Sequence, residues 1–403
     1  MTVNKPNVLL TGADSFLAAH ILRILLEQNY NVRATASSLS NALYLRKHFK
    51  SALLTLAIIP NPSKPGAFDD AVKNMEYVIH TATPVFPSPI RDVQADIIQP
   101  AIRSTAELLE STQRNAAQVK QVVLTSSLAA CIDEQSNLRG YDKVIDETCW
   151  SSESIDSTSD ILAAYRVSKK FCEKAAWDFL KKNDPSFSVT AIIPSIPWGP
   201  FLHDANLSTL NPSNDLLYSM YKFETHPDPS IIFSYVDVRD LAEAHVRALD
   251  NSLASNQRIL VAAGSFTYQA VLDVLISYKH NHSSTFNNDD LLSDARANGA
   301  RMDTNKAARI LNFTEYRPFS ASLIDLITQL ELLEKSEAEV SHMPQTLQGD
   351  ATLGCPIFHP PSDSLASTSQ RPVFNSARNE NVCPVSHHAQ SEGVKCPVAH
   401  AGA

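Results

Sequence analysis

Short apolar runs alternate with stretches of helical periodicity over the first 194 residues, and this alternation constrains the fold more than any other feature. The runs that predict strands are Asn7–Leu10, Asn31–Thr35, Ala52–Ile59, Tyr77–Thr81, Gln121–Thr125 and Val189–Ile193. The stretches that predict helices are Phe16–Asn29, Phe68–Asn74, Asp92–Arg114 and Leu162–Lys182. Strands that alternate with helices are joined by right-handed crossovers, which give a parallel sheet with helices on both faces. The sequence therefore predicts an α/β fold with a doubly wound parallel sheet.

The first predicted strand and helix are joined by Thr11-Gly12-Ala13-Asp14-Ser15, which is the context that a dinucleotide-binding fingerprint requires. Gly12 permits a tight turn, and the N-terminus of the following helix would hold a pyrophosphate through its free amides and positive dipole end. Ser15 stands where a second glycine normally lets the backbone approach the phosphates. An ordinary strand-to-helix turn is the alternative, and on this motif alone the two interpretations are equal.

The residues that end the second predicted strand are expected to determine which nicotinamide cofactor binds, NADH or NADPH. A carboxylate there would bind the ribose hydroxyls of NADH, and an arginine would bind the additional phosphate of NADPH. The segment from Arg33 to Ser38 contains no carboxylate, which favours NADPH, and Arg33 and Ser37 are candidates for the phosphate. Arg33 as an exposed strand residue is an equally good interpretation, so NADH remains the alternative cofactor.

Tyr165 and Lys169 are four residues apart within a predicted helix, so their side chains share one face. A phenol with a pKa near 10 is a poor proton donor at neutral pH, and a neighbouring ammonium makes proton transfer easier by favouring the phenolate. Ser126 and Ser127 follow a predicted strand, at the edge of the sheet where open parallel sheets bind ligands. One of these hydroxyls is expected to bind a carbonyl oxygen as it gains charge, and we choose Ser127. This arrangement predicts hydride and proton transfer to a carbonyl group.

The motifs together resemble the extended short-chain dehydrogenases/reductases of the NAD-dependent epimerase/dehydratase family. Within it they are most similar to the dihydroflavonol 4-reductase subfamily, which includes methylglyoxal and aldehyde reductases of yeast. The resemblance covers residues from about 7 to 330 and rests on Thr11-Gly12-Ala13, His80-Thr81-Ala82-Thr83-Pro84, Val123 to Ser127, Tyr165 to Phe171, Trp198-Gly199-Pro200 and Tyr235 to Asp240. It implies a Rossmann fold and an NADPH-dependent carbonyl reductase.

The resemblance also implies roles for individual residues. By position, Ser127, Tyr165 and Lys169 correspond to the catalytic triad of the family. The residues expected along the cofactor are Gly12, Ser15, Phe16, Leu17, Arg33, Ser37, Thr81, Ala82, Tyr165, Lys169 and Pro194. The chain departs from the family at Ser15, Ser37, Asn61 and Arg103, where a glycine, a phosphate-binding arginine, an aspartate beside the adenine and an asparagine are usual. All four departures concern the cofactor, and none concerns the triad.

The substrate pocket is predicted from apolar residues that follow the motifs. These residues are Val85, Phe86, Leu128, Ile132 and Trp198. For any one of them taken singly, an ordinary core position is favoured over a pocket. Substrate identity therefore stays open, beyond a small-molecule aldehyde or ketone.

The pattern loosens after Pro194 and fades near residue 333, which divides the chain into three parts. We expect residues 1–194 to form the dinucleotide-binding domain, and residues 195–333 a smaller mixed substrate-binding lobe with some segments returning to the main sheet. Residues 334–403 are rich in Pro, Ser, Gln and Asn, a composition typical of a disordered tail. The tail repeats Cys-Pro-x-x-His three times, beginning at Cys355, Cys383 and Cys396.

Composition limits the partners and the compartment. With 34 Lys and Arg against 43 Asp and Glu, the net charge of −9 argues against nucleic-acid partners. No apolar stretch approaches the length of about 20 residues that spans a bilayer. The chain has 6 cysteines, too few for a disulfide framework at this length, and no signal peptide is evident from Met1 to Asn7. These features favour a cytoplasmic protein without a membrane partner.

The sequence thus predicts an NADPH-dependent reductase of an aldehyde or ketone, and the family makes a role in specialised metabolism plausible. The first alternative is the reverse reaction, in which an NAD(P)-dependent dehydrogenase oxidises a hydroxy compound. The second is a non-catalytic nicotinamide sensor whose tail responds to a metal or haem, since thiolate and imidazole ligate both. A tail that binds nothing is favoured over either ligand. The oligomeric state stays open.

Overall fold

The structure is a computed structural model, and it describes residues 5–82, 89–133, 144–156, 158, 160–227, 232–280, 292 and 301–342. The candidate pocket residues Val85 and Phe86 and the tail cysteines Cys355, Cys383 and Cys396 lie outside the described residues. Among the helices that the structure describes, none combines the length and the apolarity that a membrane span requires.

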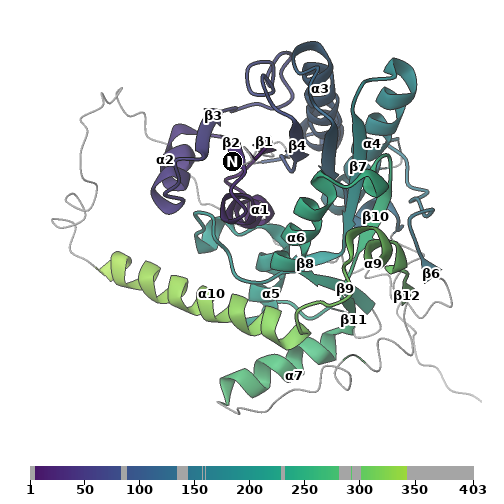
Figure 1. Ribbon diagram of the computed structural model, residues 1–403. Coiled ribbons are helices and arrows are strands. Elements are labelled where there is room, and N and C mark those ends of the chain that lie inside the picture. The colour runs from purple at the N-terminus through teal and green to yellow at the C-terminus, as the bar shows by residue number, and fades with distance from the viewer. Residues whose placement is uncertain are drawn as a thin grey trace, which may run out of the picture. The chain divides into compact units, whose positions relative to one another are not determined.

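A parallel sheet of seven strands in the order β10-β7-β5-β4-β1-β2-β3 forms the centre of the fold (Figure 1). Its strands are β1 (Asn7–Thr11), β2 (Asn31–Ala36), β3 (Leu54–Ile58), β4 (Tyr77–His80), β5 (Gln121–Thr125), β7 (Ser188–Pro194) and β10 (Arg258–Val261). The strand order reverses between β1 and β4, and such a switch point is where doubly wound sheets bind ligands. The predicted doubly wound fold is confirmed.

Helices cover both faces of this sheet. On one face α1 (Phe16–Glu27) packs against α6 (Val238–Leu249), and on the other α3 (Gln99–Asn115) packs against α4 (Ile161–Asn183) (Figure 1). A π-helical turn at Gln94–Ile98 precedes α3. The Asp160 side chain caps α4 by accepting from the Ala163 amide at 2.8 Å. These layers bury the apolar strands from both sides, as the nearly continuous apolar runs predict.

Two local expectations differ from the structure. The stretch Phe68–Asn74 forms a series of turns instead of a helix, although Phe68 and Val72 are buried. Conversely, α2 (Leu39–His48) was not expected, because it buries only two of its residues and shows little helical periodicity. Its start is fixed locally by Ser38, whose side chain accepts from the Asn41 amide at 3.2 Å.

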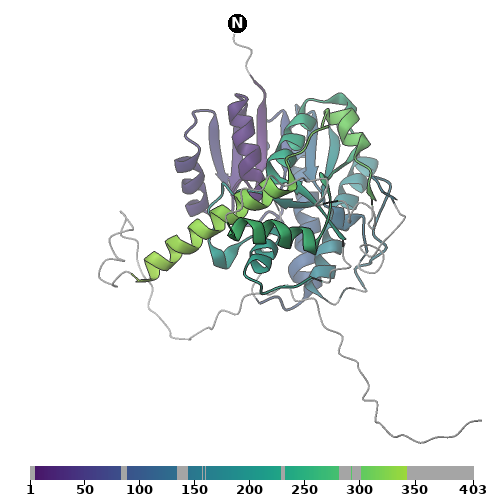
Figure 2. The same ribbon diagram turned by 90° about the horizontal axis from the view of Figure 1, so that it is seen from below.

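The smaller lobe is built on a three-stranded sheet in the order β11-β9-β8. Its elements are β8 (Ile196–Trp198), α5 (Pro212–Tyr221), β9 (Ile232–Asp237), β11 (Gly264–Thr267), α7 (Tyr268–Lys279) and α10 (Phe319–His342). Figure 2 shows α10 running beside α5 and α7. β10 lies between these elements in sequence and joins the main sheet beside β7. Two short strands, β6 (Val144–Ile145) and β12 (Arg301–Met302), pair with each other, and α9 (Asn305–Leu311) follows them.

Aromatic side chains form the core of the lobe. Trp198 is completely buried, with its ring centre 4.9 Å from that of Phe266 and 6.2 Å from that of Phe319. The Trp198 indole N–H donates to the Ser213 carbonyl at 2.7 Å. Trp198 was expected at the substrate pocket, and the structure places it in the core instead, because aromatic rings from β11 and α10 enclose it.

The end of the lobe lies beyond the boundary drawn at residue 333. α10 continues to His342, and its later turns are held by polar contacts. Glu334 pairs with Lys222 at 2.7 Å, and the Glu337 side chain accepts from the Leu207 amide at 2.9 Å. The polar composition of this segment predicted the start of a tail. In the structure these residues contact the outer surface of the lobe.

An ion network joins the lobe to the main domain. Asp237, which is completely buried, accepts from Arg239 and from the Ser322 hydroxyl at 2.7 Å. Arg239 also pairs with Asp325 on α10 at 2.7 Å. The network therefore connects the start of α6 to α10, and its members are structural.

Candidate active site

The turn after β1 fits the pyrophosphate of a dinucleotide. Gly12 has φ 65°, a backbone conformation that favours glycine, and a Cβ there would lie 3.0 Å from the Ala82 Cα. The Ser15 hydroxyl donates to the Gly12 carbonyl at 2.8 Å and does not cap α1. The first amides of α1 therefore stay available at the positive end of the helix, which is the arrangement that binds phosphate.

The end of β4 is tied to this turn. The Thr11 hydroxyl lies 2.9 Å from His80 Nδ1 and accepts from the Ala82 amide at 3.1 Å. Thr81 donates its hydroxyl to the Thr11 carbonyl at 2.5 Å. Thr81 and Ala82, both expected along the cofactor, thus lie directly beside Gly12 at the switch point.

Phe16 and Leu17 begin α1 immediately after the turn. Phe16 is buried, and its ring lies edge-on to those of His20 and His203, with centroids 6.2 Å and 6.0 Å away. Leu17 is partly buried against the main core. The two side chains therefore anchor the start of the helix, which leaves the backbone amides of this turn as the groups that face a ligand.

Arg33 and Ser37, which were expected to bind a 2′-phosphate, form hydrogen bonds within the protein instead. Arg33 directs Nη1 to the carbonyls of Asp70, Ala71 and Lys73, at 3.3, 2.9 and 2.8 Å. Its guanidinium therefore fixes the turns after β3. Ser37 donates both its amide and its hydroxyl to the Asp14 carboxylate, at 2.9 and 2.6 Å. The carboxylate that the second strand lacks is thus supplied by the turn after β1.

The two serines after β5 point to different partners. Ser126 is buried, and its hydroxyl donates to Glu173 at 2.5 Å. Ser127 is half-buried, and its oxygen accepts from the Ala129 amide at 3.1 Å, which begins the short 3₁₀ turn Leu128–Ala130. The Ser127 hydroxyl hydrogen therefore remains available to a ligand, whereas that of Ser126 is used within the protein.

Tyr165 and Lys169 lie one turn apart on α4, and both are half-buried. The Lys169 ammonium lies 5.8 Å from the centre of the Tyr165 ring. α4 packs against the 3₁₀ turn that begins at Ser127. The fold therefore brings the three residues of the predicted triad to one edge of the sheet.

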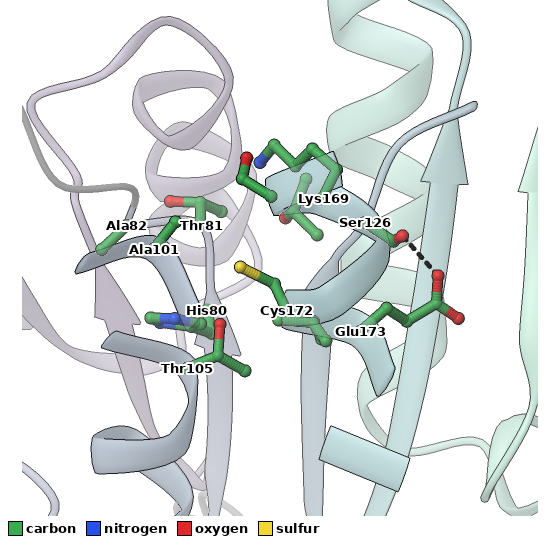
Figure 3. A pocket seen from close by; sticks show the side chains of 12 residues that line it. His80, Thr81, Ala82, Ala101, Thr105, Ser126, Lys169, Cys172 and Glu173 are labelled. Carbon is green, nitrogen blue, oxygen red and sulfur yellow. Dashed lines mark hydrogen bonds between the residues drawn. The ribbon is translucent and has the colours of Figure 1, made fainter. Parts of the chain in front are cut away.

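A pocket lies between the ends of β4 and β5 and the helices α3 and α4 (Figure 3). Its lining residues are His80, Thr81, Ala82, Ala101, Thr105, Leu124, Thr125, Ser126, Ser168, Lys169, Cys172 and Glu173. Figure 3 shows Lys169 at one end and the Ser126–Glu173 hydrogen bond at the side. Tyr165 and Ser127 are next to lining residues without lining the pocket themselves. The pocket therefore brings Lys169, Thr81 and Ala82 around one space at the carboxyl edge of the sheet.

Burial makes two reactive side chains of the pocket inert. It lowers the pKa of His80 to about 3, with a further contribution from Lys169, so the imidazole is neutral. Burial also raises the pKa of the Cys172 thiol to about 11, so the sulfur stays protonated. Neither side chain supplies an acid or a nucleophile at neutral pH. Within the described residues, no group of three His, Cys, Asp or Glu side chains gathers as metal ligands would.

Sequence reasoning missed the buried carboxylate of Glu173. It is completely buried and accepts from Ser126, from the Trp177 indole N–H at 3.0 Å and from Arg258 Nε at 2.6 Å. Arg258 is stacked on Trp150, with 3.7 Å between the guanidinium carbon and the ring centre. The spacing of four residues from Lys169 was the available signal, since it places Glu173 on the active face of α4.

Two further expected residues are mainly structural. Leu128 is buried in a small cluster with Ile145, Ile193 and Leu260, and Ile132 packs against the same cluster. Pro194 ends β7 at the same edge of the sheet and is paired with Val261. Leu128 and Ile132 therefore support the back of the 3₁₀ turn that Ser127 begins.

Comparison with known proteins agrees with this architecture. The model of the NAD dependent epimerase/dehydratase family matches residues 8–263. An NADPH-dependent methylglyoxal reductase of Saccharomyces cerevisiae is 33% identical over 337 residues, which are 80% of this chain and 98% of that protein. A ketoreductase of Aspergillus niger is 31% identical over 333 residues, covering 80% of this chain and 97% of that protein.

Solved structures give the same result. The crystal structure of yeast methylglyoxal/isovaleraldehyde reductase complexed with NADPH has a TM-score of 0.71 and 31% identity, covering 82% of this chain and 99% of that one. A related reductase of Candida albicans, also in complex with NADPH, has a TM-score of 0.73 at 31% identity, covering 81% and 99%. The likeness extends over both the main domain and the lobe. The chain therefore belongs to the NAD dependent epimerase/dehydratase family.

Proposed function

We propose that the protein is an NADPH-dependent reductase that converts an aldehyde or ketone into an alcohol. The observation that carries this proposal is the position of Lys169, which lines the pocket and faces the Tyr165 ring at 5.8 Å. The relatives that are named as methylglyoxal reductase and ketoreductase support the same reaction class. They also support NADPH, since two related reductases are known in complex with it.

In the proposed reaction, Ser127 and Tyr165 hold the carbonyl oxygen between their hydroxyl groups. A nicotinamide cofactor, when bound, would supply the hydride that the carbonyl carbon accepts. Tyr165 donates its phenolic proton to the oxygen, which completes the alcohol, and the tyrosine recovers a proton from solvent. Ser127 stabilises the oxygen as its charge grows, because its hydrogen remains available for donation.

Lys169 has two roles in this proposal. Its ammonium stabilises negative charge on the phenol oxygen of Tyr165 during proton transfer. It also lines the pocket with Thr81 and Ala82, where it is placed to hold the nicotinamide ribose. Because His80 is neutral and the Cys172 thiol stays protonated, neither side chain competes with Tyr165 as a proton donor or acts as a nucleophile in this pocket.

The reverse oxidation of a hydroxy compound uses the same residues, so the cofactor ratio sets the direction. We place the protein in the cytoplasm, which the free thiols of Cys131, Cys149 and Cys172 support. A role in specialised metabolism remains an expectation from the family.

The test is NADPH oxidation by the purified full-length protein with a panel of small and bulky aldehydes and ketones. We expect turnover with at least one carbonyl, and a loss of that turnover in Tyr165→Phe. Tyr278→Phe is the matched control, because its hydroxyl binds Glu331 at 3.0 Å on the lobe surface. Cofactor binding without reduction of any carbonyl would contradict the proposal and favour a nicotinamide sensor.

A further inference from the structure

We propose that Asp14 sets cofactor selectivity at the adenine ribose and disfavours the 2′-phosphate, so that the protein accepts NADH as well as NADPH. The inference rests on the proposed function only in that the cofactor is a nicotinamide dinucleotide. It deepens that proposal by naming a residue that determines which dinucleotide binds.

The Asp14 carboxylate is built into the turn that holds the pyrophosphate. Its Oδ2 accepts from the Ser37 amide at 2.9 Å, the Ser37 hydroxyl at 2.6 Å and Asn41 Nδ2 at 2.8 Å. These three donors are neutral. All three bonds end on Oδ2, which leaves Oδ1 facing no donor among the described residues.

The position of the carboxylate follows from the sheet. Ser37 is the first residue after β2, which pairs with β1 in parallel, so the two strands end at the same edge. In sheets of this topology the residue at the end of the second strand meets the ribose of the adenosine, where a carboxylate binds the 2′-hydroxyl and an arginine binds a 2′-phosphate. Asp14 reaches this place from the neighbouring turn and is held there by the residue that ends the strand.

Two arginines near this edge are directed elsewhere. Arg33 binds three carbonyls of the turns after β3, and Arg46 Nη1 donates to the Leu54 carbonyl at 2.9 Å. Lys47 lies eight residues beyond Leu39, at the far end of α2, about 12 Å along the helix axis at 1.5 Å per residue. Burial lowers the pKa of His203, which interacts with Asp14, to about 4, so this imidazole is neutral at pH 7.

These contacts favour a 2′-hydroxyl over a 2′-phosphate. A hydroxyl donates a hydrogen bond to Asp14 Oδ1, whereas a phosphate brings a second negative charge against the carboxylate. Like charges placed side by side in an interface disfavour binding strongly. The relatives that use NADPH therefore share the fold of this chain without determining its preference at this position.

The test is binding, measured by calorimetry without any carbonyl substrate, of NAD⁺ and NADP⁺ and of the fragments ADP-ribose and 2′-phospho-ADP-ribose. We expect Asp14→Asn to change the ratio of the two dissociation constants in favour of the phosphate-bearing ligand by about tenfold or more. Asp70→Asn is the matched control, because the Asp70 carboxylate is exposed and the substitution makes the same change in net charge. An unchanged ratio in Asp14→Asn, or the same change in both variants, would overturn the inference.

A second measurement needs no substitution. In the wild-type protein, raising the ionic strength from about 0.02 to about 0.5 M screens the repulsion, so NADP⁺ should gain affinity relative to NAD⁺. A phosphate held by cations would show the opposite sign. Because neither measurement involves turnover, a shift in the binding ratio without carbonyl reduction would contradict the proposed function and leave this inference standing. Turnover with an unshifted binding ratio would contradict this inference and leave the proposed function standing.

Discussion

The carboxyl edge of the main sheet has two ends that differ in how they use charge. At the reaction end, formed by Ser127, Tyr165 and Lys169, an ammonium lies 5.8 Å from the centre of a phenol ring, and the proposed carbonyl reduction uses these three side chains. At the nucleotide end, formed by Gly12, Asp14 and Ser37, a carboxylate stands where an arginine would bind a phosphate. Under the two proposals, the chain retains the catalytic side chains of its family, while the contacts that select the cofactor change separately.

The sharpest test of the reaction end is Lys169→Met, which keeps the apolar stem and removes the charge. We expect the rate of carbonyl reduction to fall by about 10³-fold or more, because proton transfer from the phenol and placement of the ribose both depend on this ammonium. Lys174→Met on the same helix is the control, since its ammonium lies 5.5 Å from the Trp150 ring centre. Steady-state kinetics with NADPH measures both, and equal effects of the two substitutions would remove Lys169 from the site.

Ser127→Ala is expected to have the next largest effect. Losing one donor to the developing oxyanion typically reduces kcat by about 10²-fold, with cofactor binding retained. The matched variant Ser126→Ala should mainly lower the melting temperature, because it removes a donor from the buried Glu173 carboxylate. Kinetics and thermal unfolding together distinguish the two serines. A larger loss of kcat in Ser126→Ala would reverse their assignment.

Gly12→Ala tests the nucleotide end without altering charge. The added Cβ meets the Ala82 backbone at 3.0 Å in a conformation with φ 65°, so the turn must shift. We expect NADH and NADPH to lose affinity equally, by about tenfold, given a strain of about 1–3 kcal/mol. The equal loss contrasts with the selective change expected for Asp14→Asn. A preference for one cofactor in Gly12→Ala would show that the turn itself reads the 2′ position.

Mild acid should lower the free energy of unfolding of the whole protein, with the smallest effect per residue. Burial lowers the pKa of His80 to about 3 and those of His20, His203 and His245 to about 4. Unfolded histidine titrates near 6.5, so the unfolded state binds protons that the folded state refuses between pH 6.5 and 4. Stability is therefore complete above about pH 6.5 and falls by about 1 kcal/mol per histidine at pH 5.5.

Urea unfolding at several pH values measures this loss. His203→Asn should make the dependence on pH shallower by one proton, because its ring is one of the four that remain neutral. Stability that stays constant from pH 7.5 to pH 5.5 would contradict the burial of these rings.

Most of the main domain was predictable because local pattern and tertiary structure agree there. The apolar runs became β1, β2, β4, β5 and β7, and the spacing of Tyr165 and Lys169 placed both on α4. The confirmed features are continuous apolar runs or helical spacings of three to four residues, which sequence patterns report directly.

The remainder depends on contacts between residues far apart in sequence. The Asp14 carboxylate binds Ser37, which is 23 residues away in the sequence. The second strand alone, which contains no carboxylate, therefore could not predict that a carboxylate lies at its end. Trp198 follows a family motif but is enclosed by rings from β11 and α10. α10 extends past residue 333, where Glu334 and Glu337 bind the lobe, although the composition of this segment is typical of a disordered tail. Such pairings leave no local periodicity.

The ion pair between Glu173 and Arg258 has a consequence for the order in which the protein is made. The helix that carries Tyr165 and Lys169 emerges from the ribosome 85 residues before the guanidinium that neutralises its buried carboxylate. A buried charge without its partner destabilises a fold by several kcal/mol, about 3–5 when one partner of a pair is removed. In nascent chains that end before β10, the Glu173 carboxylate has, among the described residues, only Ser126 and the Trp177 indole as donors, so we expect α4 to pack less stably. We therefore expect α4 to reach its full stability only after β10, the last strand of the main sheet, has been synthesised.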